Sequence, residues 1–408
     1  MEVLTGGKSP RVFRLNWCNS NTDGIVRKKE EQVRMYFLSP KFLGLFFIGG
    51  QVLDEVFMKL AIEEARLGGR KTKTNPLVGA VLVKDGEVLS KGHHEVFGQA
   101  HAEVNCLKNM DARGATLYVT LEPCSHYGKT PPCADLIVEK GLKRVVIGEL
   151  DSNPKVQGKG LARLKEAGID VTYGVLEEDC HKLNEIFHFT MKRKRPYIFL
   201  KWAQSLDGKI ATASGESQWI TGEEARKDAN RLRGLTDAIL VGRNTASLDN
   251  PRLTCRTGGE NPLRIVLDSQ LKTPRTHALF KDQPTIFYVQ EGLGDGPLTE
   301  TARKVGVPLK NGKLSLKEIL RDLYENQHVS RLMVEGGGQV LASFIQEGYA
   351  DQFVVYEAPL VLGAKGKPSL GDLHYPSLKE AFWSSFKEVD ILGQDLKIKG
   401  GPECLLEL

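Results

Sequence analysis

The chain has 408 residues, enough for two or three domains, and 41% of them are hydrophobic, as in an ordinary globular protein. Its 56 basic and 51 acidic residues leave a net charge of only +5, and no dense stripe of Lys and Arg with interleaved aromatic residues indicates a nucleic-acid partner. No apolar run reaches the length of a transmembrane helix, so we expect no membrane partner. The seven cysteines lack the paired spacing of a disulfide framework, which favours a reducing, cytoplasmic location.

Residues 1–51 show no sustained periodicity and include a polar, basic run. We predict either a poorly ordered extension or a sequence whose true start lies further along, near Val52. Asp54 is interpreted as the N-cap of a helix that ends at Gly68-Gly69, because apolar residues recur at helical spacing between them. Two strands are expected at 78–83 and 87–90, joined by a tight turn.

The window from His101 to Cys133 carries one imidazole, one carboxylate and two thiols. We predict that His101, Cys124 and Cys133 bind Zn²⁺ and leave its fourth position open for water, as in a catalytic zinc site. Glu103 lies two residues from the His ligand and is the predicted proton carrier. Bound Zn²⁺ lowers the pKa of its water to about 7, which supplies a nucleophile at neutral pH. The order H-x-E, P-C, C is that of the zinc nucleobase deaminases.

One feature departs from the general deaminase pattern, in which two residues separate the cysteines. Here residues 125–132 separate them, and their Gly and Pro content indicates a loop that still brings both thiolates to one metal. Within this loop, His126 and Lys129 are predicted substrate contacts. The alternative is a structural zinc, or two buried thiols without metal. A structural site needs a fourth ligand, and the nearby candidate, Cys106, is more naturally a small buried residue.

Strands and helices alternate through the rest of this half, which predicts a layered α/β domain. Helices are expected at 101–110, 133–140, 161–167 and 177–190, and strands at 116–121, 144–150 and 169–173. The charged stretch 191–196 ends in Pro and is interpreted as a solvated linker in preference to an anion site. It sets the predicted domains at 52–194 and 195–408.

The sequence pattern of the second half also predicts an α/β domain. Strands are expected at 197–203, 238–241, 263–267, 285–289, 331–334 and 353–356, and helices at 221–233, 316–324 and 339–346. Thr221 and Glu224 are interpreted as the capping box of the first of these helices. The glycines at 336–338, between a strand and a helix, are typical of a phosphate cradle. A tight turn that requires positive φ is an equally open alternative.

Other residues of this half are ambiguous from the sequence alone. Asp207 beside Gly208 can be only a turn residue, Arg233 and Arg256 only surface charges, and Trp219 is more often a core residue than a cofactor contact. These residues do not by themselves establish a reductase.

Taken together, the motifs resemble the bifunctional deaminase–reductase family of riboflavin biosynthesis over residues 53–408. The motifs are Asn75-Pro76 with Val78-Gly79, His101-Ala102-Glu103, residues 122–126 with 128–133, 205–209, and Glu335-Gly336-Gly337. The long loop between the cysteines is this family's own feature. The resemblance implies a cytidine-deaminase-like N-terminal domain and a dihydrofolate-reductase-like C-terminal domain. The first deaminates 2,5-diamino-6-ribosylamino-4(3H)-pyrimidinone 5′-phosphate, and the second uses NADPH to reduce the ribosyl group to a ribityl chain.

The resemblance also implies roles for individual residues. Besides the zinc ligands and Glu103, it assigns substrate binding in the first domain to Asn75, His94, His126 and Lys129. In the second domain it assigns substrate contacts to Ser217, Arg233, Leu253, Arg256 and Glu335. It assigns cofactor contacts to Ala203, Trp219, Thr245, Asp249, Ser269, Gly337 and Gly338. We further suggest that Asp207 assists catalysis near the reacting carbon, by a proton or a hydrogen bond.

Two rival functions remain to be weighed against this interpretation. A deaminase of nucleic acid, such as a tRNA adenosine deaminase, predicts a basic groove, C-x-x-C spacing and no nicotinamide site. A non-catalytic, zinc-stabilised binding protein has no use for the carboxylate of Glu103. A homo-oligomer is expected only by resemblance.

Overall fold

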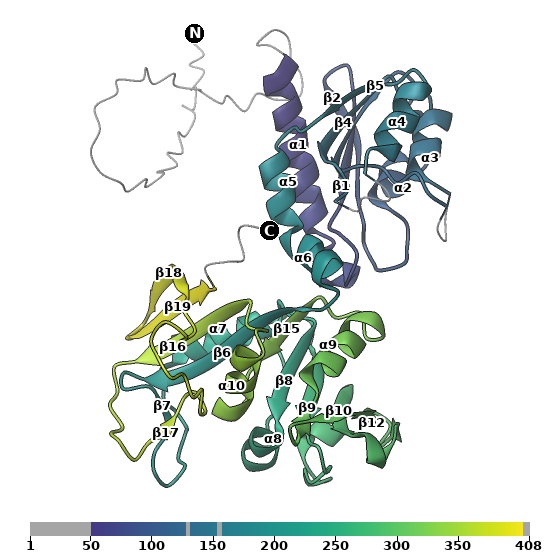
Figure 1. Ribbon diagram of the computed structural model, residues 1–408. Helices are drawn as coiled ribbons and strands as arrows, with labels where there is room; N and C mark the ends of the chain where they lie inside the picture. The colour runs from purple at the N-terminus through teal and green to yellow at the C-terminus, as the bar shows by residue number, and fades with distance from the viewer. Residues whose placement is uncertain (1–49, 128–130, 153–156, 403–408) are drawn as a thin grey trace, which may run out of the picture. The chain divides into compact units, whose positions relative to one another are not determined.

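The computed structural model describes residues 50–127, 131–152 and 157–402, which form two main sheets with helices on their faces (Figure 1). The first sheet has the strand order β2-β1-β3-β4-β5. Strand β1 runs antiparallel to β2 and β3, whereas β3, β4 and β5 are parallel. The strands are β1 (Gly79–Lys84), β2 (Glu87–His93), β3 (Thr116–Leu121), β4 (Arg144–Glu149) and β5 (Asp170–Tyr173).

Helices cover both faces of the first sheet because successive residues of its strands point to opposite sides. In β1, Ala80 and Leu82 pack with α2, α3 and α4, whereas Val81 and Val83 pack with α1 and α5. Figure 1 shows α1 and α5 together on one side of the sheet and the other three helices on the opposite side. The helices are α1 (Gly50–Arg66), α2 (Ala102–Leu107), α3 (Cys133–Glu139), α4 (Lys159–Glu166), α5 (Glu177–Leu183) and α6 (Glu185–Arg193).

The second sheet has ten strands, of which β12, β10, β9, β8, β15, β6 and β16 are parallel neighbours in that order. Two antiparallel strands, β19 and β18, extend the sheet beyond β16, and β11 pairs with β12 at the other edge. The strands are β6 (Tyr197–Ser205), β8 (Ala238–Gly242), β9 (Leu263–Leu267), β10 (Thr285–Gln290), β11 (Gly296–Pro297), β12 (Ala302–Val307), β15 (Arg331–Val334), β16 (Gln352–Ala358), β18 (Ser385–Leu392) and β19 (Asp395–Gly401).

The second sheet is also covered on both faces. Apolar residues of α9 (Leu316–Glu325) and α10 (Gly338–Gln346) fill one core cluster, and α7 (Glu223–Arg233) and α8 (Arg243–Asp249) pack on the other side. Two further strand pairs are small: β7 (Lys209–Ala211) with β17 (Lys367–Pro368), and β13 (Leu309–Lys310) with β14 (Lys313–Leu314). Short 3₁₀ turns lie at η1 (Gly69–Thr72), η2 (Ala278–Phe280) and η3 (Glu291–Leu293).

The prediction that Asp54 caps the first helix is wrong. Helix α1 begins four residues earlier, at Gly50, and Asp54 lies inside it. Its buried carboxylate accepts hydrogen bonds from the Tyr118 hydroxyl at 2.9 Å and from the Arg144 guanidinium at 2.8 and 2.7 Å. Asp54 therefore anchors α1 to β3 and β4. The rest of the predicted extension, residues 1–49, lies outside the described residues.

The predicted helix 177–190 is two helices, α5 and α6, which meet at Asn184. The Asn184 side chain accepts a hydrogen bond from Leu77 N at 2.8 Å and donates one to Leu77 O at 3.0 Å. Bonds of this kind let Asn compete with the helical backbone pattern. The break turns α6 away from α5 while it fixes both helices to the start of β1.

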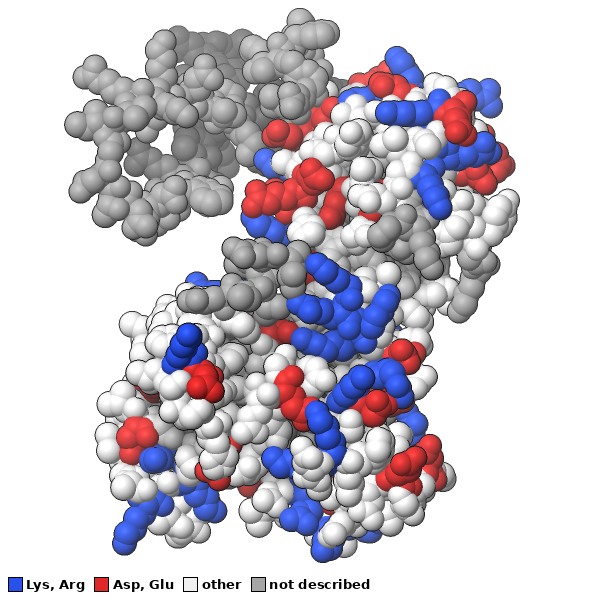
Figure 2. Space-filling view, viewed as in Figure 1, with Lys and Arg blue, Asp and Glu red and all other residues white. Residues whose placement is uncertain are grey.

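The prediction of a solvated linker at 191–196 is wrong for part of the segment. Helix α6 continues to Arg193, and Arg195 forms a bidentate ion pair with Asp351, which is 2% exposed. The guanidinium also lies 4.9 Å from the Phe189 ring centroid. Lys192, Arg193 and Lys194 are exposed. Figure 2 shows Lys and Arg gathered near the end of α6, whereas blue and red side chains intermingle over most of the visible face.

The predicted capping box is also wrong. Gly222, not Thr221, precedes the first turn of α7, and no side chain caps that end. The Gly222 N–H instead donates to the carboxylate of Asp395 at 2.6 Å, so a residue distant in sequence supplies the acceptor. Helix α8 and the strands β18 and β19 are elements that the sequence pattern did not predict.

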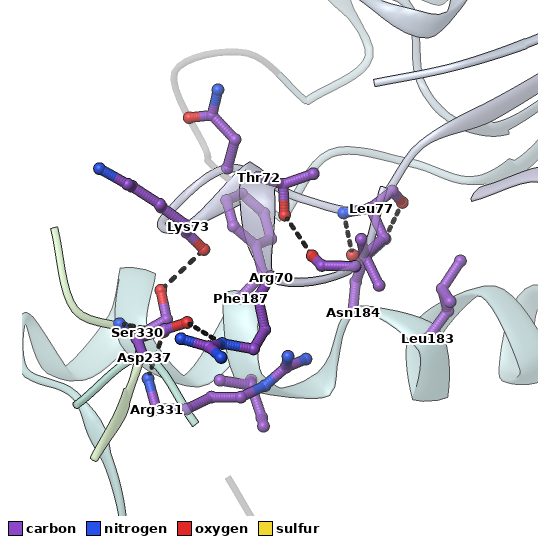
Figure 3. Close-up of a pocket in the computed structure, with 13 residues that line it drawn as sticks. Arg70, Thr72, Lys73, Leu77, Leu183, Asn184, Phe187, Asp237, Ser330 and Arg331 are labelled. Atoms are coloured by element: carbon purple, nitrogen blue, oxygen red, sulfur yellow. Dashed lines mark hydrogen bonds and ion pairs between the residues drawn. The ribbon is translucent and has the colours of Figure 1, made fainter. Parts of the chain in front are cut away.

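One contact between segments far apart in sequence involves Arg70 of η1 (Figure 3). Its guanidinium donates to the backbone oxygens of Gly234 at 3.2 Å and Glu260 at 2.6 Å, and its Nε lies 3.6 Å from Asp237 Oδ1. Nearby, the Ser330 hydroxyl donates to Lys73 O at 3.0 Å. Within the described ranges, no helix is long and apolar enough to cross a membrane.

Candidate functional site

The three predicted zinc ligands are placed by the ends of regular elements. His101 is the N-cap residue of α2, Cys124 follows β3, and Cys133 is the first residue of α3. The backbone N–H of Cys133, at the polar start of α3, donates to Cys124 Sγ at 3.3 Å and so favours a thiolate at Cys124. Three separate elements thus converge on one point at the end of β3.

The distances between the ligand atoms suit a tetrahedral zinc ion. His101 Nδ1 lies 3.6 Å from Cys124 Sγ and 3.3 Å from Cys133 Sγ. Zn–S and Zn–N bonds of about 2.3 and 2.0–2.1 Å place such atoms about 3.6 Å apart in a tetrahedron. All three ligand atoms lie within 4.8 Å of one another. Neither Cys106 nor any other fourth group belongs to this cluster among the described residues, which favours an open coordination position.

The electrostatics of the cluster favour a thiolate. Hydrogen bonds from Cys133 and His101 lower the pKa of Cys124 to about 4, although burial opposes the shift. The hydrogen bond with Cys124 raises the pKa of His101. Cys106, by contrast, is fully buried in the core, and burial raises the pKa of its thiol to about 11. Cys106 therefore behaves as the small core residue that the sequence suggests.

Glu103 lies in the first turn of α2, two residues after His101, and is 3% exposed. Burial, and to a smaller extent the negative charge on Cys124, raise the pKa of its carboxyl group to about 7. A carboxyl group with such a pKa can both accept and release a proton near neutral pH.

His94 and Asn75 form a polar pair on the wall of the same site. The ring of His94 is bound on both sides, with Nδ1 3.0 Å from Ala100 O and Nε2 3.0 Å from Asn75 Nδ2. A carbonyl oxygen only accepts, so Nδ1 carries the proton and Nε2 accepts from the amide. Burial lowers the pKa of His94, which agrees with a neutral ring. The pair therefore fixes the orientation of the Asn75 amide.

These residues line one cavity of about 370 Å³, a size suited to a small ligand. Asn75, His94, His101, Glu103, Cys124 and His126 all contribute to it. The structure thus brings together every predicted residue of the first site that it describes, Cys133 joining through its contact with His101. Lys129 lies outside the described residues.

Several cavity residues were missed by the sequence analysis, among them Asp151, Phe187 and Tyr324. Asp151 follows the end of β4, so its place after a strand of a parallel sheet was an available signal. Its loop is held by Glu122, whose buried carboxylate accepts backbone N–H groups of Asp151, Gly158, Gly160 and Leu161 at 2.9–3.2 Å. Nothing in the pattern around Phe187 or Tyr324 distinguishes these residues from core side chains.

A second polar centre lies in the ten-stranded sheet. The Arg233 guanidinium at the end of α7 forms a bidentate pair with Glu335, which follows β15, at 2.9 and 2.8 Å. Burial acts to raise the pKa of Glu335, but the charges of Arg233 and Lys201 outweigh it and hold this pKa at about 2. Burial lowers the pKa of Lys201 in turn. Arg233 is therefore not a surface charge.

Lys201 was missed, although the sequence holds a signal for it. It is the one charged residue in the run 197–203, which is otherwise apolar. A charge in the middle of a strand buried on both faces needs a partner or a function. Lys201 Nζ lies 5.6 Å above the ring of Tyr356, and Glu335 is its nearby counter-charge.

The glycines at 336–338 serve close approach, not positive φ. Gly337 is the N-cap of α10 with φ −59°, and a Cβ on Gly338 would lie 3.0 Å from Ser369 O. A Cβ on Gly337 would lie 3.6 Å from Thr245 Oγ1, so the starts of α8 and α10 are neighbours. Two predicted cofactor residues, Thr245 and Gly337, are thereby brought together, and the positive-φ alternative is wrong.

The other predicted residues of this half are distributed around these elements. Ser269 lines a groove with Gln339 and Val340 of α10, and Ala203 lies on β6. Leu253 is buried in a core cluster, and Arg256 is exposed on a loop held by Asn230 of α7. Ser217 and Asp249 are exposed. Trp219 is 66% exposed and is therefore not a core residue; the Arg226 guanidinium lies 4.7 Å from its ring.

Asp207 occupies a turn and holds two loops together. Its carboxylate accepts hydrogen bonds from the Ser205 hydroxyl at 2.6 Å, Leu362 N at 3.1 Å and Gly363 N at 2.7 Å. These bonds lower its pKa to about 2. An ionised carboxylate with this environment is suited to anchor the 362–363 loop and is unsuited to donate a proton.

Comparisons with known families agree with this division of the chain. The model of the cytidine and deoxycytidylate deaminase zinc-binding region matches residues 51–149, and the model of the RibD C-terminal domain matches residues 196–392. The riboflavin biosynthesis protein RibD of Aquifex aeolicus is 45% identical over 353 residues, which cover 85% of this chain and 98% of the relative. RibD of Escherichia coli is 39% identical over 361 residues, covering 84% and 98%.

Solved structures give the same result. RibD of Acinetobacter baumannii matches with a TM-score of 0.76 and 34% identity, covering 87% of this chain and all of that one. The diaminohydroxyphosphoribosylaminopyrimidine deaminase/5-amino-6-(5-phosphoribosylamino)uracil reductase of Thermotoga maritima matches with a TM-score of 0.74 and 38% identity over the same share of each chain.

Proposed function

The chain belongs to the RibD family and is a bifunctional deaminase and reductase of riboflavin biosynthesis, and from this premise we propose which residues carry each reaction. Its first domain is cytidine-deaminase-like, its second is the family's reductase domain, and their cofactors are Zn²⁺ and NADPH. We place the domains at 52–194 and 195–408. The deaminase acting on nucleic acid and the non-catalytic binding protein are not favoured.

We assign zinc binding to His101, Cys124 and Cys133. The observation that carries this assignment is the separation of His101 Nδ1 from the two sulfur atoms, 3.6 and 3.3 Å, which is close to the edge of about 3.6 Å of a tetrahedron around Zn²⁺. Zinc bound there supplies a water of lowered pKa beside the substrate. Glu103 accepts a proton at its carboxylate and passes it to the leaving amino group, a role supported by its burial and its pKa near 7.

The substrate of the first domain is, in our proposal, the phosphorylated diaminopyrimidine 2,5-diamino-6-ribosylamino-4(3H)-pyrimidinone 5′-phosphate. The amide of Asn75, fixed by the neutral ring of His94, is suited to recognise the polar edge of a pyrimidine. His126 lies on the same cavity wall, and we retain Lys129 as a predicted substrate contact. Asp151 is added to this set because it lines the same cavity.

For the reductase we propose that Arg233, Glu335 and Lys201 are polar residues that line the substrate site. The ion pair holds the Arg233 guanidinium rigidly, and Arg256 lies on the adjoining loop. Ser217 and Leu253 remain proposed substrate contacts. NADPH supplies the hydride, so these residues position and polarise the ribosyl group.

The cofactor site is proposed at the adjacent starts of α8 and α10. The first backbone N–H groups of a helix have no partner within that helix, and such a start suits a phosphate group. Thr245, Gly337 and Gly338 lie there, and Ser269 lines the neighbouring groove. Ala203, Trp219 and Asp249 remain proposed contacts. A cytosolic location is proposed because the zinc ligands must stay reduced, and a homo-oligomer because the resemblance implies one.

A coupled assay on the purified protein tests both reactions. Ammonia release is followed with the diaminopyrimidine ribotide in the absence of NADPH, and absorbance of the reduced nicotinamide is followed after NADPH is added. We expect ammonia first and NADPH oxidation second. NADPH oxidation without ammonia release would show that the zinc domain is inactive, and neither signal from zinc-loaded protein would contradict the assignment of both sites.

A further inference from the structure

A second cluster of potential metal ligands lies in the first domain, apart from the zinc site. We propose that Glu149, His181 and His188 bind a divalent transition metal, such as Zn²⁺, Co²⁺ or Ni²⁺. One carboxylate oxygen and two imidazole nitrogens all lie within 4.8 Å of one another. Two His and one carboxylate form a donor set that proteins use for zinc, and it contains no thiolate.

The three side chains come from different elements of the fold. Glu149 ends β4, His181 lies in α5 and His188 in α6. His181 Nδ1 lies 2.7 Å from Glu149 Oε1, and His188 Nε2 lies 3.1 Å from Glu149 Oε2. The carboxylate therefore has one imidazole nitrogen at each oxygen. Residues seven positions apart on one continuous helix lie about 10 Å apart along its axis, so the break at Asn184 between α5 and α6 is what brings both imidazoles to one carboxylate.

Burial and outer contacts resemble those of a metal site with an open side. The side chains of Glu149 and His188 are 9% and 10% exposed, whereas that of His181 is 55% exposed. The other nitrogen of His188, Nδ1, lies 2.8 Å from the Ser152 hydroxyl. Metal-binding histidines almost always use their second nitrogen in such a bond, which orients the ring. The exposed side leaves room for water ligands.

The stacking of the His181 and His188 rings determines which movement metal binding requires. The rings of His181 and His188 are stacked, with centroids 4.6 Å apart and planes 5° apart. Lone pairs in two parallel planes cannot both point at one ion, so one ring must tilt. His188 is held by Ser152 and by contact with Phe187, whereas the side chain of His181 is 55% exposed and has room to tilt on its solvent side. Metal binding therefore costs a rotation of one surface side chain.

The position of the cluster also connects it with the pyrimidine cavity. Asp151 follows Glu149 by two residues, Phe187 directly precedes His188, and both line that cavity. A metal at the cluster would hold the end of β4 against α5 and α6 behind the cavity wall. The proposed site is thus distinct from the catalytic zinc site but belongs to the same domain.

Metal titration of the full-length protein, without a polyhistidine tag, tests the proposal. The protein is first brought to one zinc equivalent and then titrated with Co²⁺ by calorimetry and absorbance. We expect a second equivalent to bind without the near-ultraviolet charge-transfer band that thiolate ligands produce. Glu149→Gln and His188→Ala should weaken this binding by at least about 100-fold, and Ser152→Ala by about tenfold. Lys182→Ala, an exposed neighbour of His181, should bind like the wild type.

Two results would overturn the proposal. One is a wild-type protein that binds a single equivalent, and the other is a Glu149 or His188 variant that retains the second equivalent. Retention of the first zinc and of ammonia release shows that a variant is folded. Should Glu149→Gln or His188→Ala fail this control, His181→Ala provides the same test from the surface, because the His181 side chain is 55% exposed.

Discussion

At the residue scale, the burial of Glu103 sets the pKa that its proposed role as proton carrier needs. Replacing it by Gln keeps the shape of the buried side chain but removes the group that accepts a proton. We expect Glu103→Gln to retain the zinc content of the wild type and to lose deamination by about 10²–10⁴-fold. Metal analysis and ammonia release measure the two effects. Loss of zinc from this variant would identify Glu103 as a ligand and contradict its role as proton carrier.

The buried Glu335 carboxylate supports a second prediction, on stability. Glu335→Gln leaves the half-buried charges of Arg233 and Lys201 without their partner, which costs at most the roughly 3–5 kcal/mol of breaking a fully buried pair. Denaturant unfolding, followed by fluorescence of Trp202 in the neighbouring strand, measures the change. A matched control is Glu388→Gln, because this carboxylate pairs with Lys399 on the surface, where such pairs contribute about 0–1 kcal/mol.

The same residue predicts a pH dependence. The folded pKa of about 2 lies below the value of about 4.3 for an unfolded Glu, so its contribution is fully present above pH 4.3 and is lost as the pH falls toward 2. The difference in unfolding free energy between wild type and Glu335→Gln should therefore be constant from pH 8 to pH 5 and shrink below pH 4. A difference that stays constant down to pH 3 would show that the carboxylate is not held ionised by its neighbours.

At the scale of elements, the turn that contains Asp207 leads to a test between two roles for its carboxylate, an anchor for a loop or a group that transfers a proton. If Asp207 anchors the 362–363 loop, Asp207→Asn keeps one acceptor oxygen and should lower the reduction rate only modestly, with an unchanged pH profile between pH 5 and 9. If it transfers a proton, the rate should fall by about 10²–10⁴-fold. We expect the first result, because a carboxyl with a pKa of about 2 holds no proton at neutral pH. Steady-state NADPH oxidation across that range measures the difference.

The segment that enters the second domain gives a prediction about its boundary. Arg195 and the buried Asp351 fix β6 to the start of β16 through a bidentate pair and a bond from Ile198 N. Arg195→Ala should destabilise the second domain by about 3–5 kcal/mol, because Asp351 is left buried and unpaired. Lys192→Ala, three residues earlier and exposed, should have little effect. Equal unfolding midpoints for the two variants would support the solvated linker that the sequence suggested.

Periodicity predicted the regular elements well where local sequence and tertiary packing agree. The strands 116–121, 263–267 and 331–334 have the predicted bounds, because their apolar runs end at polar turns. The prediction failed where a distant partner decides the outcome. Asn184 breaks a helix by binding Leu77, and the N-cap residue of α7, Gly222, donates to Asp395 where a cap by Thr221 was predicted. Strand β18 is largely exposed, and polar residues interrupt its apolar ones, so it lacks the continuous apolar run of a core strand.

The residues of the two sites also divide into those that local sequence predicts and those that only tertiary packing brings together. Motif spacing found the residues around His101 because the chemistry of zinc restricts both ligand type and order. It could not find Phe187 or Tyr324, which line the cavity through packing. Lys201 and Glu335 become meaningful only as a pair, since each alone reads as an isolated charge. Their proximity follows from β15 and β6 being neighbours in the sheet, which local sequence does not reveal.

At the scale of the whole molecule, the zinc cluster and the Arg233–Glu335 pair draw on separate sheets. All three proposed zinc ligands lie between residues 101 and 133. Among the described residues, the core cluster of the ten-stranded sheet contributes no ligand to this zinc cluster. Removing zinc with a chelator should therefore abolish ammonia release while NADPH oxidation continues when the deaminated intermediate is supplied. Restoring one zinc equivalent should restore ammonia release. The reductase rate on the supplied intermediate is the control, measured in the same preparation before and after chelation. A parallel loss of both activities would show that the second site depends on the metal of the first, through contacts such as those of Arg70 with Gly234 and Glu260.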